Sequence, residues 1–368
     1  MIDDKEIILK KFGICDTKEI KPFGTGLINN SFKVLTKNGQ VYLLQRLNSI
    51  ALPKIDIVLK NIEVIGDFLT NLGENCLKLC KTTDGDNHIT DADGFIWRVY
   101  PFIENSNSYD FTTDEKVISQ VAYGFGRFDK LVKGIRDGAV KYSDDNFHNT
   151  REKYESLIKA TNENFANRLN EVENEVAIVQ SLIELANTEG LNLFEICDKR
   201  NCGELKTQVV HNDTKLNNCL LDKDDNYLCV VDLDTAMPGL VINDYADGVR
   251  YIANTTTEDE EDLEKVDINF NSLKAYTFGF FSGLDFAITK EELELLPLSL
   301  CSIAFELGCR FLADYLNGDV FFKIEDTKPN LNLIRARVQF KLCLKFIENY
   351  AKIEGIINDI FMQRVNLI

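Results

Sequence analysis

The sequence predicts an α+β fold with a small β-rich N-terminal lobe and a larger, mainly helical C-terminal lobe. Its 368 residues exceed the length at which a single hydrophobic core usually divides. Residues 18–103 have mostly strand-like patterning, whereas apolar residues recur at helical spacing from about residue 112. A second, short β patch at 209–234 interrupts the helical part. We therefore expect lobes at 1–103 and 104–368.

The N-terminal lobe is expected to contain two hairpins and one helix. The first hairpin should turn at Asn38-Gly39, because both residues tolerate positive φ. A helix follows in "IDIVLKNIEVIGDFLTNL", whose apolar residues form one stripe that can pack on a sheet. The second hairpin lies in "NHITDADGFIWRVYPFIE" and should turn at Asp93-Gly94.

The C-terminal lobe is expected to begin with a helix whose capping box pairs Thr112 with Glu115. Its β patch consists of "LNNCLLD" and "YLCVVDLD", joined by "KDDN". The acidic run at 255–265 is interpreted as a solvated loop or helix start without a function. Further helices are expected at about 151–170, 174–189, 266–284, 291–316 and 331–352.

Composition limits the possible partners. The formal net charge of −18 argues against nucleic acid or an anionic membrane, because both require clustered Lys and Arg. ATP would need magnesium and a local cationic pocket. The charged N-terminus has no signal-peptide core, and we expect no apolar run of the roughly 18 residues that cross a bilayer. These features predict a cytoplasmic protein, a monomer or weak homo-oligomer, whose ten cysteines are mostly buried free thiols.

Polar residues in the second β patch point to phosphoryl transfer. The segment at 209–221 reads "VVHNDTKLNNCLL", in which His211, Asp213 and Asn218 have the register of the kinase loop H-R-D-L-x-x-x-N. Asp232, at the end of the next apolar strand, takes the place of the metal-binding D-F-G aspartate. This chemistry needs a carboxylate near the attacking hydroxyl and oxygen ligands for magnesium.

The same residues also allow interpretations other than phosphoryl transfer. His211 could be a hydrogen-bonded core histidine. The segment "DKDDNYLCVVDL" begins like an EF-hand loop, but Tyr227 replaces its glycine and Leu233 its final glutamate. The chain contains no G-x-S-x-G element and no Walker A sequence, which excludes an α/β-hydrolase elbow and a P-loop.

Candidate nucleotide-binding residues lie in the N-terminal lobe. Gly24 and Gly26 in "FGTGLINNSF" resemble a kinase glycine loop, although a plain glycine turn is an equal alternative. The third strand has no lysine, so Arg46 is the candidate cation, with Glu63 as a possible partner. The expected adenine contacts are backbone groups of the inter-lobe segment, around Tyr100, Phe102 and Ile103.

Several motifs together resemble a known family: "VVHNDTKLNNCLLD", "CVVDLDTAMPGL", "NDYADGVR", "NFHNTREKYE" and "RFLADYLNGD". They are similar to N-acetylhexosamine 1-kinases, which belong to the aminoglycoside phosphotransferase and choline kinase superfamily. The similarity runs from about residue 22 to residue 322. It implies a two-lobed protein-kinase-like fold and ATP- and magnesium-dependent phosphorylation of the anomeric hydroxyl of GlcNAc or GalNAc.

The resemblance implies a role for each matching residue. Asp213 would be the general base and contact the sugar hydroxyl, and Asn218 and Asp232 would bind magnesium. Arg310 and Tyr251 would contact the sugar. Lys215 has two open roles, because it could bind the γ-phosphate or could instead pair with Asp213 or a neighbouring carboxylate.

Two positions depart from the family pattern. Leu27 stands where histidine is usual, and Phe321 stands where tyrosine is usual. Each change replaces a polar sugar contact with an apolar one, which should weaken selection among hydroxyl and amide groups. A kinase of this fold acting on another sugar or amino alcohol is therefore the first alternative. The second is a nucleotide-binding pseudokinase, although such proteins usually lack one of Asp213, Asn218 and Asp232.

Overall fold

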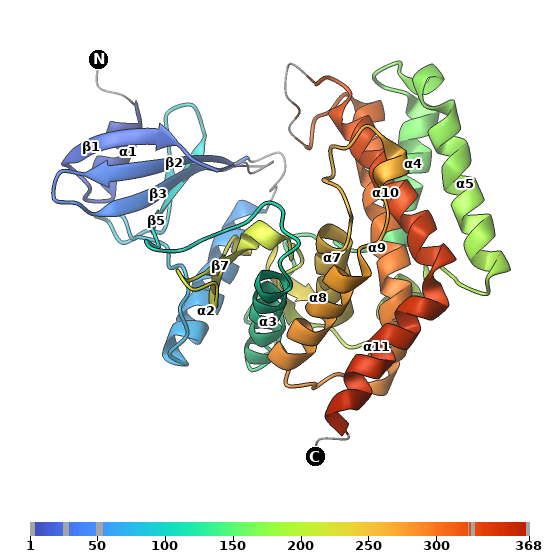
Figure 1. The fold of residues 1–368 in the computed structure, drawn as a ribbon. Coiled ribbons are helices and arrows are strands. Elements are labelled where there is room, and N and C mark those ends of the chain that lie inside the picture. The colour runs from blue at the N-terminus through green and yellow to red at the C-terminus, as the bar shows by residue number, and fades with distance from the viewer. Residues whose placement is uncertain (1–3, 25–28, 49–53, 323, 325–327, 366–368) are drawn as a thin grey trace. The chain divides into compact units, whose positions relative to one another are not determined.

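The computed structural model describes residues 4–24, 29–48, 54–322, 324 and 328–365. It divides the chain into two compact units. Unit 1 comprises Met1–Ser106 and Ile135–Ser143, and unit 2 comprises Asn107–Gly134 and Asp144–Ile368. Unit 1 contains the larger antiparallel sheet and unit 2 is mainly helical, which confirms the predicted α+β class (Figure 1).

The sheet of unit 1 is antiparallel, with strand order β1-β2-β3-β5-β4. Both predicted hairpin turns are confirmed. Gly39 has φ +88° between β2 and β3, and Gly94 has φ +86° between β4 and β5, a conformation that glycine adopts without steric cost. The strands are β1 (Thr17–Pro22), β2 (Asn30–Thr36), β3 (Val41–Arg46), β4 (Ile89–Thr90) and β5 (Ile96–Pro101).

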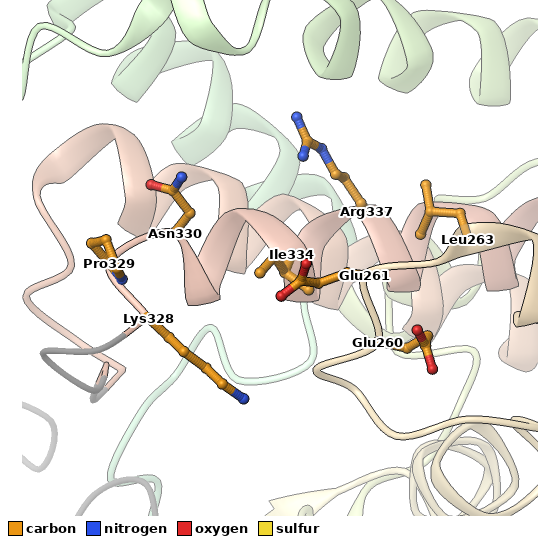
Figure 2. A pocket seen from close by; sticks show the side chains of 8 residues that line it. All are labelled: Glu260, Glu261, Leu263, Lys328, Pro329, Asn330, Ile334 and Arg337. Atoms are coloured by element: carbon orange, nitrogen blue, oxygen red, sulfur yellow. The ribbon is translucent and has the colours of Figure 1, made fainter.

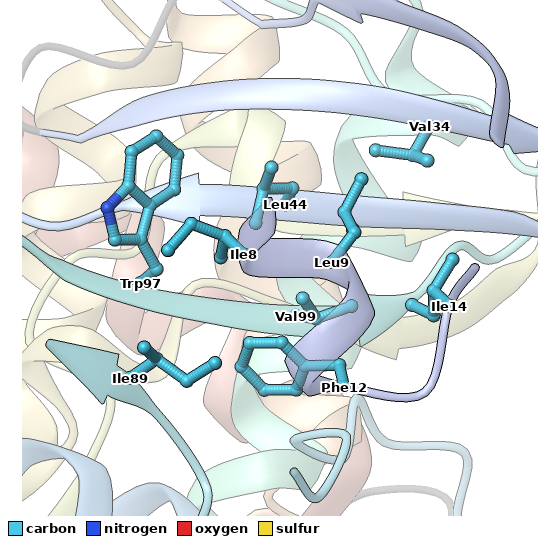
Figure 3. Packing of buried hydrophobic residues seen from close by; sticks show 9 residues of the cluster. All are labelled: Ile8, Leu9, Phe12, Ile14, Val34, Leu44, Ile89, Trp97 and Val99. Atoms are coloured by element: carbon cyan, nitrogen blue, oxygen red, sulfur yellow. The ribbon is translucent and has the colours of Figure 1, made fainter. Parts of the chain in front are cut away.

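A short N-terminal helix, α1 (Asp4–Lys11), covers one face of this sheet (Figure 3). The sequence analysis did not predict it. Leu9 of α1 is fully buried and packs in one cluster with Leu44 of β3 and Val99 of β5. Because alternate residues of a strand point to opposite faces, Leu44 and Val99 define the α1 face of the sheet.

The second helix of unit 1, α2 (Ile55–Asn71), follows the predicted apolar stripe closely. Its one deeply buried polar residue, Asn61, is 2% exposed. The Asn61 side chain donates to the carbonyl of Lys141 at 2.7 Å and accepts from the Lys141 amide at 2.9 Å. These two bonds attach Ile135–Ser143 to unit 1, although the sequence analysis placed that segment in the second lobe.

Unit 2 combines helices with two short antiparallel pairs of strands (Figure 1). Strand β6 (Gln208–Val210) pairs with β9 (Met237–Gly239), and β7 (Cys219–Leu221) pairs with β8 (Tyr227–Val230). The helices are α3 (Glu115–Val132), α4 (Thr150–Glu163), α5 (Glu173–Thr188), α6 (Glu195–Asn201), α7 (Val241–Ile252), α8 (Phe270–Gly283), α9 (Lys290–Asn317), α10 (Leu331–Glu348) and α11 (Tyr350–Val365).

The start of α3 differs from the prediction. Asp114 is the N-cap, and its side chain accepts from the amides of Lys116 and Val117 at 2.8 and 3.3 Å. The Thr112 hydroxyl accepts instead from the Asp114 amide at 3.1 Å. A carboxylate satisfies free amides at a helix start and also interacts favourably with the helix dipole, so it caps this helix two residues later than expected.

Helix α9 forms the centre of unit 2. By length and composition it could cross a membrane, so the expectation that no apolar run is long enough was wrong. In the structure 94% of its most apolar window is buried, and α4, α7 and α10 pack against it. Such burial is typical of a core helix, whose apolar surface faces protein on several sides.

The cysteines have the predicted state. All ten are free, and six of them are buried. Buried thiols of this kind act as small apolar side chains, and burial raises the pKa of Cys301 to about 12.

Candidate active site

His211 is a structural residue of the catalytic loop, the segment 211–218 of unit 2. Its ring is fully buried between Phe125 and Phe128 of α3, with centroid distances of 5.3 and 5.7 Å. Nε2 lies 2.9 Å from the carbonyl oxygen of Val231, and Nδ1 lies 3.2 Å from the amide of Asp213. One nitrogen therefore donates and the other accepts, which is the pattern of a neutral ring. The structure therefore shows His211 as a hydrogen-bonded core histidine.

Asp213 is held on both carboxylate oxygens and is 26% exposed at its side chain. Lys215 Nζ lies 3.1 Å from Oδ1, and Asn218 Nδ2 donates to Oδ2 at 3.0 Å. The same Asn218 nitrogen donates to the Asp213 carbonyl at 2.9 Å. Of the two open roles for Lys215, the structure therefore contains the pair with Asp213.

Asn218 and Asp232 are the predicted metal ligands. The Val231 amide donates to the carbonyl of Asn218 at 2.9 Å, so backbone pairing brings the start of β7 to the end of β8. Because Nδ2 of Asn218 donates to Asp213, its Oδ1 is the side-chain atom suited to a cation. One amide oxygen and one carboxylate fit magnesium, which takes further ligands from phosphate and water. The described part of the chain contains no group of three or more His, Cys, Asp or Glu arranged for a metal.

Helix α7 holds the catalytic loop through two carboxylates that the sequence analysis missed. Asp244 accepts from the amides of His211 and Asn212, both at 2.7 Å. One turn later, Asp247 accepts from the amide of Thr214 at 3.0 Å. Asp244 is fully buried and Asp247 is 3% exposed. The signal was present as "NDYADGVR", where two aspartates three apart share one helix face.

Asp247 also belongs to a buried charge network. Arg250 binds Asp247 at 2.8 Å and also contacts Glu258, and it is itself 1% exposed. Glu258 lies in the acidic run that was interpreted as a solvated segment without function, and that interpretation was wrong for this residue. Burial would lower the pKa of Lys215, but Asp213, Glu258 and Asp247 together raise it above its ordinary value. Lys215 therefore stays charged.

A further carboxyl group lies beneath the catalytic loop. Asp129 of α3 is fully buried, and its carboxyl group lies beside that of Asp244. Burial raises its pKa well above the ordinary value, and the nearby charge of Asp244 raises it further. Both effects favour the protonated form of the Asp129 carboxyl group.

Arg310 and Phe321, both predicted sugar contacts, lie close together. The Arg310 guanidinium is 5.8 Å from the ring centre of Phe321, 5.4 Å from Phe322 and 5.3 Å from Phe147. Among the described residues Arg310 makes no hydrogen bond or ion pair. Asp314 fixes the turn that carries Phe321, because its carboxylate accepts from that residue's amide at 2.9 Å.

A histidine links this aromatic group to the catalytic loop. His148 lies 3.1 Å from the carbonyl oxygen of Asn212 and 3.0 Å from Glu306 of α9. Arg310 follows Glu306 by four residues on the same helix, so the two side chains share a face. His148 lies in the motif "NFHNTREKYE", in which no role was predicted for the histidine.

Tyr251 was predicted to line the sugar pocket. Its hydroxyl donates to the backbone carbonyl of Asp110 at 3.0 Å, and its ring lies 5.8 Å from the Arg250 guanidinium. Its hydroxyl therefore has a backbone partner in unit 2, and its contact with a sugar stays a prediction.

Two predicted site residues of unit 1 lie outside the described residues: Gly26, predicted to contact the nucleotide, and Leu27, predicted to contact the sugar. Gly24 is exposed with φ +80°. The preceding Phe23 packs edge-on against Phe102, with ring centres 5.3 Å apart. The Phe102 amide, directly after β5, donates to the carbonyl of Val41 at the start of β3 at 3.0 Å. The first glycine and the end of β5 therefore lie close together within unit 1.

Arg46 does not pair with Glu63 in the structure. Its guanidinium lies 4.4 Å from the ring centre of Phe95, and Glu63 binds Lys60 and Lys81 at 2.8 and 2.6 Å. The reason is strand alternation, which places Arg46 on the same face of β3 as Leu44, toward α1.

The other two predicted adenine contacts have partners within unit 1. The buried ring of Tyr100 lies 5.2 Å from the Arg98 guanidinium, and the carbonyl of Ile103 accepts from the Ser106 hydroxyl at 2.8 Å. Their contact with a nucleotide stays a prediction.

A cavity of about 370 Å³ lies between the acidic run and α10 (Figure 2). Its lining contains none of the residues described above, so it is not assigned to phosphoryl transfer. The lining residues are Glu260, Glu261, Leu263, Lys328, Pro329, Asn330, Ile334 and Arg337.

Residues 19–272 match the model of the phosphotransferase enzyme family. Solved structures with the same fold include an aminopropanol kinase associated with a microcompartment, with 13% identity, coverage of 97% of this chain and 99% of the other, and a TM-score of 0.62. An aminoglycoside phosphotransferase from Alicyclobacillus acidocaldarius has 14% identity, coverage of 95% and 96%, and a TM-score of 0.59. A choline kinase from Cryptosporidium parvum has 13% identity, coverage of 97% and 94%, and a TM-score of 0.56. At such identities the likeness concerns the fold alone.

Proposed function

The chain belongs to the phosphotransferase enzyme family, and from this premise we propose that it transfers the γ-phosphoryl group of ATP to the anomeric hydroxyl of an N-acetylhexosamine. The observation that carries the proposal is the orientation of Asp213. Lys215 and Asn218 each hold one of its carboxylate oxygens, and α7 fixes the loop on which it stands. A general base must be held within hydrogen-bonding reach of the proton it removes, and this arrangement provides such a base.

In the proposed reaction Asp213 accepts the proton of the sugar hydroxyl. The hydroxyl oxygen forms a bond to the γ-phosphorus, and the bond between that phosphorus and the β–γ bridging oxygen breaks, which releases ADP. Asn218 and Asp232 would hold magnesium, which neutralises phosphate charge when it is bound. Lys215 keeps Asp213 oriented and, being charged, adds positive potential where charge develops on the transferred group.

The surroundings of Arg310 favour a neutral acceptor over a cationic one. Aromatic rings can bind ammonium groups, but the rings of Phe147, Phe321 and Phe322 already lie within 6 Å of the Arg310 guanidinium. A second cation there would be repelled. A sugar, by contrast, offers hydroxyl and amide oxygens that the guanidinium can bind. This supports a hexosamine derivative carrying a neutral N-acetyl group over an amino alcohol.

The ligands and the cellular location of the reaction are proposed from the sequence. ATP, magnesium and the sugar are the expected ligands, and the cytoplasm is the expected location. The net charge of −18 is unfavourable for nucleic acid and anionic lipid, which supports small molecules as the partners.

Two measurements test the proposal. ³¹P NMR of a mixture of the protein, MgATP and GlcNAc should show a sugar 1-phosphate, and ADP release should be greatest with N-acetylhexosamines in a panel that includes hexoses and amino alcohols. Faster turnover of choline, ethanolamine or aminopropanol would overturn the acceptor assignment. ADP release that no acceptor stimulates would overturn the kinase assignment itself.

A further inference from the structure

His148 is buried at a junction of three elements of unit 2. Its side chain is 4% exposed, and it precedes α4 with φ +49°, in a left-handed conformation that histidine tolerates better than most residues. Its Nε2 faces the carbonyl oxygen of Asn212 at 3.1 Å, and its Nδ1 faces Glu306 Oε1 at 3.0 Å. The residue after Asn212 is the proposed base, Asp213.

The two partners of His148 determine its charge. A backbone carbonyl can only accept, and the Glu306 carboxylate also accepts from the Thr150 hydroxyl at 3.0 Å. Both ring nitrogens therefore face acceptors, and an imidazolium, which carries a proton on each nitrogen, is the form that satisfies both partners. His211 shows the opposite pattern, since its Nδ1 accepts from an amide.

The charged groups around His148 come from three helices. Glu306 and Arg310 face it from α9, Asp247 faces it from α7, and Lys153 of α4 faces Glu306. Burial lowers the pKa of His148, but Glu306 and Asp247 outweigh burial and Arg310, and the pKa is raised above its ordinary value of 6.5. The pKa of Glu306 would be raised by burial, but His148, Arg310 and Lys153 hold it below its ordinary value.

The ion pair also affects Arg310. A glutamate and an arginine four residues apart on one helix commonly pair with each other. Here the Glu306 carboxylate is bonded to His148 and Thr150 instead, at 3.0 Å in each case. Its charge is thereby balanced without Arg310, whose guanidinium remains among the phenylalanine rings.

We propose that His148 is a positioning residue for phosphoryl transfer, which as an imidazolium clamps the Asn212 carbonyl to Glu306 and so ties the loop of the base to the helix that carries Arg310. This inference rests on the proposed function for its catalytic consequence. His148 touches neither acceptor nor nucleotide in this scheme. It sets the position of Asp213 and leaves Arg310 available to the acceptor.

The clamp predicts a specific pH dependence. A group whose pKa is raised on folding stabilises the folded form below its unfolded pKa, and that stabilisation is lost as pH rises through the folded pKa. The clamp is therefore complete at and below the ordinary histidine pKa of about 6.5, and it is lost only as pH rises through the raised folded pKa. The turnover number should fall over the same alkaline range in which the ring loses its proton.

The charge of His148 can be observed directly, because the chain has only three histidines. ¹⁵N NMR of the imidazole rings at pH 7 should show both nitrogens of His148 protonated and His211 neutral. Substitution of His88, a half-buried residue of unit 1, by Gln assigns one signal and is the matched control for activity. A neutral His148 ring throughout pH 5–8 would overturn the inference.

Glu306→Gln separates positioning from a merely structural role. The amide can still hydrogen-bond to Nδ1 and Thr150, but it cannot hold the imidazolium, so the alkaline fall in kcat should begin at lower pH. His148→Gln keeps a donor near the Nε2 position and His148→Asn keeps one near Nδ1. His148→Asn should therefore lose at least about tenfold more kcat than His148→Gln, because it loses the bond to the loop.

The outcomes distinguish this inference from the proposed function. Suppose that the wild-type protein is active and that the folded Glu306→Gln variant has the same pH profile. This result would overturn the clamp but not the proposed function. Equal kcat in wild type and His148→Asn would do the same. Failure of the unmodified protein to phosphorylate any acceptor would overturn the proposed function and, with it, the catalytic role of His148.

Discussion

Asp213 is oriented by residues that lie within five positions of it in the chain. Lys215 and Asn218 hold its two carboxylate oxygens at 3.1 and 3.0 Å, and the ring of His211 accepts from its amide at 3.2 Å. This local arrangement explains why the motif has such regular spacing. Each contact spans so few residues that one inserted residue would break it.

Asp213→Asn should lower kcat by at least about 10²-fold, because the amide cannot accept the acceptor's proton. The variant should keep its fold, since an amide of the same shape can still bond to Asn218. Coupled measurement of ADP release, with circular dichroism for the fold, checks this. Asp224→Asn in the exposed hairpin turn is the matched control and should keep full activity. Wild-type turnover in a folded Asp213→Asn protein would contradict the assignment of the base.

Arg310→Met should raise the KM for the sugar by about tenfold or more, which corresponds to the loss of a hydrogen bond from a charged group. The KM for ATP should stay unchanged, because the proposal places no nucleotide contact on this side chain. Initial-rate kinetics with each substrate varied in turn checks both values. Lys290→Met, on the exposed start of the same helix, is the control. An equal rise in both KM values would indicate a general disturbance of unit 2 instead.

At the scale of elements, α7 positions the catalytic loop and α3 supports it from beneath. Asp244 of α7 accepts from two loop amides, and the buried Asp129 of α3, whose pKa is raised by burial and by Asp244, lies beside it. The approach of α3 to α8 depends on glycine, because a Cβ added at Gly126 would lie 2.2 Å from the carbonyl oxygen of Phe280.

Asp129 predicts that stability falls as pH rises. Its folded pKa is raised, so above about pH 4 the unfolded chain releases a proton that the native protein retains. This group alone contributes a decrease of up to about 1.4 kcal/mol per pH unit until its folded pKa is reached. Asp129→Asn, which mimics the neutral acid, should remove that slope. Urea unfolding from pH 5 to 8 measures it, and equal slopes in the variant and wild type would contradict the prediction.

At the scale of the whole molecule, the large negative charge affects how a triphosphate can bind. With a formal net charge of −18, long-range electrostatics repel ATP, so affinity must come from local cations. Lys215 is one such cation in unit 2, and magnesium at Asn218 and Asp232 would be the other. Binding of nucleotide and binding of metal should therefore depend on each other.

Chelation should abolish phosphoryl transfer without unfolding the protein, because no fold-defining contact of unit 2 described above needs a metal. Addition of MgATP at about 100 times its dissociation constant should stabilise the fold by about 2.7 kcal/mol. ATP with excess EDTA should stabilise it far less. Thermal unfolding under the three conditions checks this, with Asp232→Ala as the variant expected to lose the MgATP effect. Full stabilisation by ATP in EDTA would contradict the metal assignment.

Local chemistry made several features predictable from the chain alone. The turns at Asn38-Gly39 and Asp93-Gly94, the helix over Ile55–Asn71 and the spacing of Asp213 and Asn218 all depend on neighbours a few residues away. Turn residues, apolar periodicity and loop spacing are each visible in a short window of sequence. The α+β class follows from the same local signals.

Tertiary structure alone decided which distant side chains meet. The sequence contains Asp244, Glu258 and His148, but their roles come from partners elsewhere in the chain. Asp244 and His148 both bind Asn212, which is 32 and 64 residues away, and Glu258 binds Arg250, which is 8 residues away. Arg46 is a second example. The sequence does not show which face of β3 packs against α1, and the structure places the Arg46 side chain on that face, beside the ring of Phe95. The physical reason is that burial and pairing of charge depend on three-dimensional proximity, which composition and periodicity do not specify.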